Sequence, residues 1–510
     1  MNKQDMPGSG GGAAEVAVRT YSGNRALDHE EGLIFEIGRP EVCGVDLPDI
    51  KLPPSRLAGM ERTEPIGLPG LSEPEAVRHY VRLSQRNAAI DTSLYPLGSC
   101  TMKHNPRLGE KMARLAGFAD IHPLQPQKTV QGAIALIAEL ANWLKELTGM
   151  PAVCMAPKAG AHGELCGIIA IRAALDARRE KRHIILVPES AHGTNPATAA
   201  LCGFRVQSIK STPDGQVDLP SLKHALTSDV AALMLTNPNT SGLFERDMIA
   251  IGEALHECGA YFYCDGANFN AIMGRVKPGD LGIDAMHINL HKTFSTPHGG
   301  GGPGAGPVVF SERLAPFAPL PLVVHHAGGL RLVEHRADAP GTSPFGRMAA
   351  FHGQMGMFVR ALAYMLSHGR DGLRQASGDA VLSANYVLAS LKDVITAPYE
   401  GPCMHEALFD DTFLKGTGVT TLDIAKRLID EGFHPMTVYF PLIVHGAMLI
   451  EPTESEPKRS LDQFISVMRA VAAEAKSGAS AAFKQAPMLA PRRRLDETAA
   501  ARNPVLRWKG

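Results

Sequence analysis

Short apolar runs alternate with segments of helical spacing between about residues 150 and 310. Helical spacing is present at 163–179 and 247–258. The apolar runs are IILVP (184–188), VAALML (230–235), AYFYC (260–264), AMHINL (285–290) and PVVF (307–310). Strands that are apolar throughout and alternate with helices are typical of a mainly parallel sheet with helices on both faces. We therefore predict a large α/β domain over residues 149–345.

The chain before this domain has a different pattern. Residues 1–70 are rich in proline and glycine and predict an extended arm. Helical spacing then predicts helices at 72–90 and 128–148, within a helical segment that spans 71–148. Between these helices, the polar stretch 91–107 is too irregular for either a helix or a strand.

The chain after the large domain predicts a smaller α/β domain over 346–480. Its elements are a long helix at 347–394, a strand at 404–409 and an amphipathic helix at 421–432. Residues 481–510 are polar and basic and predict a tail.

Composition excludes several classes of protein. The formal net charge is -1 and there is no long basic block, so we expect neither nucleic acid nor an anionic membrane as partner. No apolar run reaches the length of a membrane span, and the first fifteen residues lack the features of a signal or transit peptide. The eight cysteines are scattered without a C-x-x-C pair, which favours reduced thiols in a cytoplasmic protein.

Polar side chains follow four of the predicted strands, at the point where each strand ends. In an open parallel sheet, ligands bind beyond the carboxyl ends of the strands. Packing alone needs no polar group there, so this convergence predicts a binding site. The residues are His192, Thr194 and Asn195 after the first run, Thr236, Asn237 and Asn239 after the second, Asp265 and Asn268 after the third, and His291 and Lys292 after the fourth.

Lys292 and Asp265 together indicate a particular cofactor. Pyridoxal phosphate needs a lysine for covalent attachment and an acid that keeps its pyridine nitrogen protonated. Burial at a strand end would lower the pKa of a lysine toward that of a usable nucleophile. Each residue also has an ordinary explanation, since Lys292 could be a solvated loop lysine and Asp265 the N-cap of a helix.

The cofactor's phosphate requires an anion site. Gly160 and Gly163 lead into a helix, whose free N–H groups and dipole favour a phosphate. A glycine run at 299–302 follows Lys292 and would let the backbone approach a ligand closely. His192 could stack on the pyridine ring, or it could be an ordinary loop histidine that bonds to backbone.

Several of these segments resemble one enzyme family in the same order along the chain. They are YPLGSCTMKHNPR, SAHGTNPA, TNPNTSG, CDGANFNAI and INLHKTF with the glycine run after it. Together they resemble glycine decarboxylase, the P protein of the glycine cleavage system, from about residue 60 to about residue 470. The chain resembles only the second, cofactor-bearing half of single-chain members. This implies subunit 2 of the split form, which works with a separate subunit 1.

The resemblance implies fold type I of the pyridoxal-phosphate-dependent transferases, the aspartate-aminotransferase-like fold. It implies that Lys292 carries pyridoxal 5'-phosphate covalently, that Asp265 pairs with the pyridine nitrogen and that His192 stacks on the ring. The other predicted cofactor-binding residues are Gly160, Ala161, Thr194 and Asn268. Where this chain has AGAHGE, single-chain members have a serine at the first position and a glutamine at the fourth. Ala159 therefore has no hydroxyl to offer a phosphate, and the role of His162 stays open.

The resemblance also implies the reaction and its partners. Glycine loses CO2, and its aminomethyl group passes to the lipoyl arm of the H protein. Lys292 moves protons, with His291 as a second candidate. The group that binds the glycine carboxylate is not identified by the sequence. Subunit 1 would complete an α2β2 heterotetramer, and segment 91–107 and the arm 1–70 are candidates for its interface, the segment alternatively for the mouth of the site.

Three other interpretations stay open at the level of sequence. A different fold-type-I enzyme for a small amino acid, either a decarboxylase or a desulfurase, would keep the cofactor, although no cysteine follows Lys292 in a Gly/Ser-rich loop. A non-catalytic partner subunit would have no reason to keep both Lys292 and Asp265. A metal-binding protein that uses its 20 histidines would show no chromophore; we predict no metal site.

Overall fold

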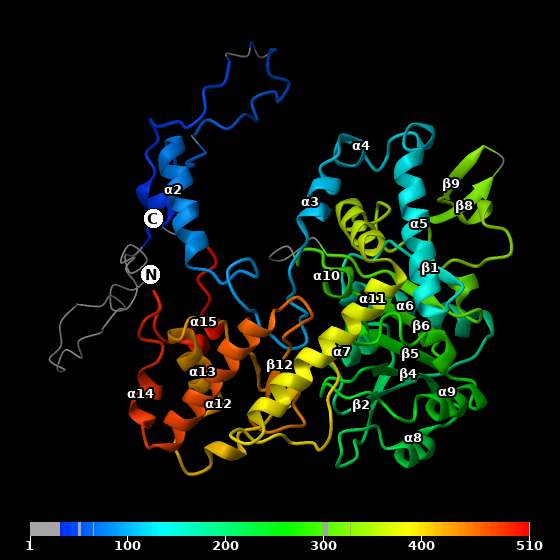
Figure 1. Cartoon of the computed structure of the whole chain (residues 1–510). Coiled ribbons are helices and arrows are strands. Elements are labelled where there is room, and N and C mark those ends of the chain that lie inside the picture. The colour runs from blue at the N-terminus through cyan, green and yellow to red at the C-terminus, as the bar shows by residue number, and fades with distance from the viewer. Residues whose placement is uncertain are drawn as a thin grey trace.

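The computed structural model describes residues 31–48, 51, 53–64, 66–298, 304–326 and 328–508. Its centre is a seven-stranded sheet with the order β1-β7-β6-β5-β4-β2-β3 (Figure 1). The strands are β1 (Ala152–Cys154), β2 (Ile184–Pro188), β3 (Arg205–Ile209), β4 (Val230–Thr236), β5 (Tyr261–Gly266), β6 (Ala285–Ile288) and β7 (Val308–Phe310). Strands β3, β2, β4, β5 and β6 run parallel, and β7 is antiparallel to its two neighbours, β6 and β1. The predicted mainly parallel sheet is confirmed.

Helices cover both faces of this sheet. They are α5 (Gln131–Thr148), α6 (Gly160–Ala177), α7 (Thr194–Leu201), α8 (Leu219–Ala225), α9 (Met248–Glu257) and the four-residue α10 (Leu290–Thr293). Alternate residues of one strand point to opposite faces. Phe262 therefore packs in one core cluster with Leu140 and Leu255, whereas its neighbour Tyr263 packs in the other with Ile171. The apolar runs are buried on both sides, as the sequence pattern predicts.

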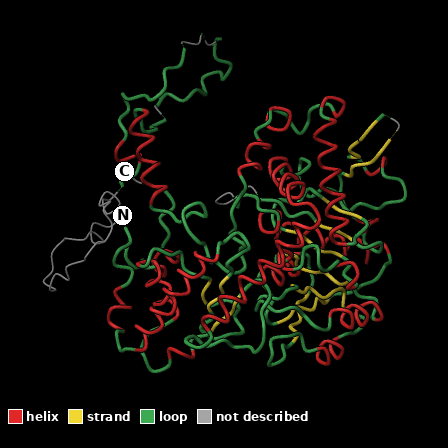
Figure 2. Tube along the Cα trace, in the orientation of Figure 1, coloured by secondary structure: helices red, strands yellow, loops and turns green. Residues whose placement is uncertain are grey.

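The long helix α11 (Met355–Leu391) connects the large sheet to a second core. Its first half packs on the large domain through Met365 and Leu373, and its second half packs on the small domain through Ala384 and Leu391. Gly369 has a positive φ of 61° and interrupts the helix between Met365 and Leu373. Figure 2 shows the two groups of strands on either side of this connection.

The small domain is built on a three-stranded antiparallel sheet with the order β10-β12-β11. Its elements are β10 (Ala407–Phe409), α12 (Thr421–Asp430), β11 (Thr437–Val438), β12 (Met448–Ile450), α13 (Lys458–Lys476), α14 (Ser480–Gln485) and α15 (Glu497–Arg502). Phe483 is fully buried in its core. The beginning of the predicted tail therefore packs as part of this domain.

The N-terminal part of the chain holds α1 (Ile34–Ile37), α2 (Glu73–Gln85), α3 (Arg107–Ala113) and α4 (Ala116–Ala119). Helix α2 begins after Ser72, whose N–H donates to Glu75 at 2.9 Å, as in a capping box. Figure 1 shows α2 apart from the large sheet and near the C-terminus. There the Phe35 ring stacks on Trp508 at 5.3 Å between ring centroids. None of the described helices is long and apolar enough to cross a membrane.

Some strands were not predicted from the apolar pattern. Strand β3 is an edge strand with four of its five residues exposed, so it lacks an apolar run. The hairpin of β8 (Leu322–His326) and β9 (Gly329–Val333) is largely exposed or half-buried, and Leu332 and Val333 are its buried residues. The domain boundaries proposed from the sequence stay a prediction, but α5 packs in the core of the large domain rather than separately from it.

Candidate functional site

A cavity of about 160 Å³ lies beyond the carboxyl ends of the central strands. The residues that line it come from the ends of β4, β5 and β6, from the starts of α6 and α7, and from the loop before α3. They are Ser99, Gly160, Ala161, Glu164, His192, Thr194, Thr236, Thr240, Asp265, Ala267, Asn268, His287, Asn289 and Lys292. Every residue predicted to bind the cofactor is on this wall, because parallel strands bring their carboxyl ends to one edge of the sheet.

Lys292 lies on α10, directly after β6. Asn289, which precedes this short helix, accepts the backbone N–H of Lys292 through its carbonyl oxygen at 3.1 Å. The Lys292 side chain is half-buried and lies on the same cavity wall as Asp265. The turn therefore holds an amine at the cavity, as a covalent anchor for a carbonyl compound requires.

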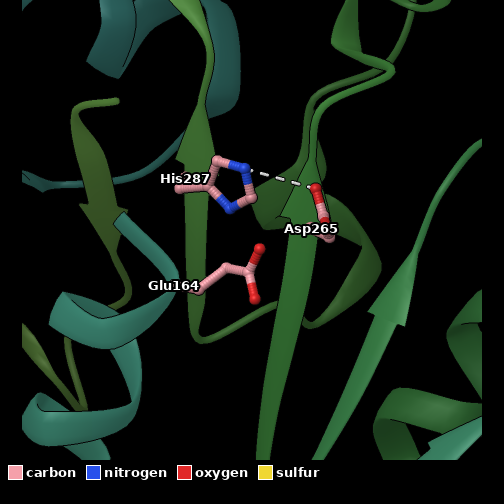
Figure 3. Close-up of side chains that lie close together, drawn as sticks. All are labelled: Glu164, Asp265 and His287. Carbon is pink, nitrogen blue, oxygen red and sulfur yellow. Dashed lines mark ion pairs between the residues drawn. The ribbon is translucent and has the colours of Figure 1, made fainter. Parts of the chain in front are cut away.

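Asp265 is buried at the end of β5 and is held from several sides. Its carboxylate accepts the Ala267 N–H at 2.9 Å and the Asn195 side-chain amide at 3.1 Å, and His287 Nε2 lies 3.3 Å away (Figure 3). Burial opposes ionisation, but His287, the Ala267 N–H and Lys292 outweigh it, so the pKa of Asp265 is lowered. Asp265 thus presents a negative charge to the cavity.

A second buried carboxylate, Glu164 of α6, lies beside Asp265 (Figure 3). Its two oxygens accept the Thr194 hydroxyl at 2.7 Å and the Asn195 amide at 2.9 Å, so Asn195 bridges Glu164 and Asp265. Burial, and then the Asp265 charge, raise the pKa of Glu164. The two carboxylates are therefore driven toward different protonation states, with Asp265 as the ionised one.

The sequence prediction did not include Glu164 or His287 among the site residues. Both are single ionisable residues inside apolar elements, in GELCGIIAI and AMHI, and that contrast was the available signal. His287 is the neighbour of Asp265 in the parallel register of β5 and β6. Its Nδ1 lies 2.6 Å from the Tyr263 hydroxyl, which can donate to it. Nε2 would then carry the ring proton and direct it at Asp265.

Tyr263→Phe is expected to lower the free energy of unfolding by about 1–3 kcal/mol, because it leaves a buried ring nitrogen of His287 without its partner. Urea denaturation would measure this loss. Tyr261→Phe is the matched control, since it removes a hydroxyl from the same strand away from His287. An equal loss in both variants would contradict the role of Tyr263 as the partner of His287.

One side of the cavity is formed by the starts of α6 and α7. A Cβ atom on Gly160 would come within 2.8 Å of Asn289 Oδ1, so this position suits only glycine. Ala159 provides no side-chain cap for α6, which leaves its first N–H groups for a ligand. His192 is exposed at the cavity, and its Nδ1 lies 2.8 Å from the Thr194 hydroxyl.

Two buried polar atoms at this cavity have no hydrogen-bond partner among the described residues. They are Thr236 Oγ1 and Asn289 Oδ1, and both residues line the cavity. A buried polar atom without a partner is costly, so the pair indicates a polar ligand. An anchoring amine, a buried carboxylate and a helix start free for an anion are the features that pyridoxal phosphate needs, so the residues fit this cofactor.

His291 is not among the described residues that line the cavity, and the glycine run 299–302 lies outside the described residues. The His291 ring lies against residues 304–305 and His298. Burial, then His298 and Lys292, lower the pKa of His291 to about 3. It is therefore neutral at physiological pH and a weak base, which leaves Lys292 as the better proton carrier.

The irregular segment 91–107 reaches the cavity through Ser99. Thr101 and Lys103 are buried behind it, while His104 is exposed. Ser99 therefore lies at the predicted site, as it would if this segment formed the mouth of the site. A place for this segment at a subunit interface stays a prediction.

Comparison with known proteins gives closely similar relatives. The family model for the C-terminal domain of glycine dehydrogenase matches residues 376–490, and that for class-V aminotransferases matches 163–306. A probable glycine dehydrogenase (decarboxylating) subunit 2 from Caulobacter vibrioides is 67% identical over 493 residues, covering 96% of this chain and 94% of that protein. Its counterpart from Desulforamulus reducens is 49% identical over 487 residues, covering 94% and 99%.

Solved structures share the fold at lower identity. A crystal structure of glycine decarboxylase (P-protein) of the glycine cleavage system, in inhibitor-bound form, has a TM-score of 0.67 at 21% identity and covers 81% of this chain and 94% of that one. A cysteine desulfurase from Thermococcus onnurineus NA1 has a TM-score of 0.57 at 15% identity, covering 75% and 95%. At such identities the likeness concerns the fold alone.

Proposed function

This chain belongs to the family of glycine dehydrogenase (decarboxylating) subunit 2, and from this premise we propose how its cavity takes part in the decarboxylation of glycine. The single observation that carries the proposal is the convergence of Lys292, Asp265 and an uncapped helix start on one small cavity.

The match to class-V aminotransferases implies pyridoxal phosphate as the cofactor. When bound, it supplies an electron sink for the pair left behind as CO2 departs. We assign its covalent attachment to Lys292 Nζ and its pyridine nitrogen to the Asp265 carboxylate. His192 would lie against the ring, Asn268 would complete the wall beside Asp265, and Gly160, Ala161 and Thr194 would hold the phosphate.

The protein's own groups would act as follows. Asp265, kept ionised by its neighbours, stabilises a positive charge at the ring nitrogen. Asn195 and the Ala267 N–H prevent the Asp265 carboxylate from turning away. Lys292 would accept and return protons at its Nζ.

The residues that line the cavity also indicate how the glycine carboxylate would be bound. None of the described residues that line the cavity is an arginine, and Lys292 is its only lysine. A strong ion pair with the carboxylate would stabilise the bound substrate more than a transition state that is losing this charge. We infer that a hydroxyl group, with Ser99 as the candidate, orients the carboxylate without a formal charge.

The partners belong to the proposal as well. The printed name of the relatives, subunit 2, implies a subunit 1. We propose an α2β2 heterotetramer in the cytoplasm that passes the aminomethyl group to the lipoyl arm of the H protein. Exposed apolar side chains on the N-terminal arm, such as Leu47, Met60 and Ile66, suit burial against a partner.

The test is the exchange of labelled bicarbonate into the carboxyl group of glycine by the purified chain with subunit 1 and lipoylated H protein. We expect exchange with glycine and none with alanine or serine. Omitting the H protein or subunit 1 should lower the rate strongly. An enzyme that carries pyridoxal phosphate and is assembled with both partners, yet exchanges no label, would contradict the proposal.

A further inference from the structure

Residues 98–104 form a segment without helix or strand, here called the strap, that runs between the small domain and the turn carrying Lys292. It begins where Leu97 pairs with Ile450 of β12 in an isolated bridge. Gly98 is packed so closely that an added Cβ would come within 2.5 Å of the Leu449 side chain. Ser99, the next residue, lines the cavity.

Alternate residues of the strap are held by three glutamates of the small domain. The Ser99 N–H donates to Glu406 Oε2 at 2.8 Å. The Thr101 N–H donates to Glu451 Oε2 at 2.8 Å, and its hydroxyl to Glu451 Oε1 at 2.6 Å. Lys103 Nζ then donates to Glu454 Oε1 at 2.6 Å.

Burying these carboxylates costs folding free energy, so their burial needs a role that explains it. Glu406 and Glu451 are fully buried at adjoining ends of β10 and β12, where two like charges lie close together. The fully buried His405 has Nε2 at 3.1 Å from Glu406 and 3.8 Å from Glu451. Burial lowers its pKa, but the two carboxylates outweigh this and raise it, so a protonated ring offsets part of their charge.

The strap itself has an unfavourable backbone. Ser99 and Thr101 have positive φ values of 63° and 51°, in a region that residues with a Cβ seldom adopt. Their N–H groups have no strand partner in this conformation. The Glu406 and Glu451 carboxylates accept both N–H groups and so compensate for the conformation that turns Ser99 toward the cavity.

The strap also contacts the lysine-bearing turn. The Cys100 carbonyl accepts His298 Nε2–H at 2.9 Å, and the His298 ring packs edge-on against that of His291, the neighbour of Lys292. Lys103 Nζ donates to the carbonyl of Thr293, the residue after Lys292, at 2.8 Å. The strap therefore joins the buried glutamates to both sides of Lys292.

We propose that Glu406, Glu451 and Glu454 are positioning residues of this enzyme: they hold the strap so that Ser99 forms the cavity wall for glycine and the Lys292 turn keeps its place. The catalytic consequence rests on the proposed function. The positioning itself does not, because it concerns only contacts within this chain.

Cys100 provides a probe at the centre of the strap. Burial raises the pKa of its thiol to about 11, so the thiol is unreactive while the strap is held. The measurement is the rate of iodoacetamide alkylation of each cysteine, followed by peptide mass spectrometry on the assembled holoenzyme. In Glu451→Ala, we expect Cys100 to react about tenfold faster, since a buried charge-assisted hydrogen-bonded pair is lost. Glu451→Gln should fall between it and the wild type, because an amide still offers one acceptor.

Asp423→Ala is the matched control. Asp423 is another buried carboxylate of the small domain, but it binds Lys484 and Arg494 away from the strap. Cys100 should react at the wild-type rate in this variant. In every variant the sheet cysteines Cys154 and Cys264, buried within β1 and β5, should stay unmodified, which shows that the fold is intact. Equal Cys100 rates in Glu451→Ala and wild type, or equal increases in Glu451→Ala and Asp423→Ala, would overturn the proposal.

Steady-state kinetics separate positioning from simple stability. We expect the KM for glycine to rise about tenfold in Glu451→Ala, with partial recovery in Glu451→Gln, while Asp423→Ala keeps the wild-type KM. An unchanged KM in Glu451→Ala despite a mobile strap would refute the catalytic part of the inference. A wild-type enzyme with no activity toward glycine would contradict the proposed function, while the alkylation result would still decide the positioning.

Discussion

Lys292→Ala is expected to reduce glycine decarboxylation by at least about 10³-fold, because one substitution removes both the covalent anchor and the proton carrier. The half-buried amine stands directly after β6, and His291 beside it is too weak a base to replace it. The visible absorption band of the covalently bound cofactor should disappear at the same time. Exchange of labelled bicarbonate and the absorption spectrum together measure the two losses.

Lys277→Ala is the control for this variant, since Lys277 is an exposed lysine of the large domain away from the cavity. It should keep both the band and the activity. Adding a small primary amine, such as methylamine, should restore part of the activity of Lys292→Ala if proton transfer is what was lost. A Lys292→Ala enzyme that keeps its absorption band and its rate would show that the lysine assignment is wrong.

Asp265→Asn is expected to lower kcat by about 10²- to 10³-fold, because a neutral amide cannot stabilise a positive charge in a buried, water-poor site. The amide has nearly the same shape, so the variant should fold. The substitution removes the negative charge that Asp265 presents to the cavity. In the wild type, the neighbours of Asp265 keep its carboxyl group ionised. Initial rates at saturating pyridoxal phosphate separate this loss from a weaker affinity for the cofactor.

Asp284→Asn is the matched control for Asp265→Asn. Asp284 is equally buried just before β6, but it pairs with Arg313 and His256 at the opposite end of the strands from the cavity. We expect this variant to lose stability while its kcat stays near that of the wild type. If both variants lost kcat equally, the effect of Asp265 would be one of folding and not of charge at the site.

Much of the site was predictable because its elements carry strong local signals. The runs that became β2, β4, β5 and β6 are apolar enough to be recognised as buried strands, and polar groups follow each of them. Parallel topology then brings His192, Asp265 and Lys292 together without any knowledge of side-chain geometry. The glycine at 160 was predictable from another local signal, since it leads into a long predicted helix.

The residues that escaped prediction are those whose role depends on a neighbour distant in sequence. Glu164 and His287 matter because they flank Asp265, which lies about a hundred residues after the first and 22 before the second. The strap is a stronger case. Nothing in the polar stretch 98–104 indicates that Ser99, Thr101 and Lys103 would each bind a glutamate that lies more than 300 residues later in the chain.

The sequence by itself thus determined that the sheet is mainly parallel, which polar residues follow its central strands, and the lysine and aspartate at the site. Burial and periodicity are local properties of the chain, and these features depend on them. Only the tertiary structure decided which buried charges face one another. It made Asp265 the ionised carboxylate of its pair, turned His291 away from the cavity and brought Ser99 to the cavity wall. Those outcomes depend on distances and desolvation, which arise only when separate elements pack together.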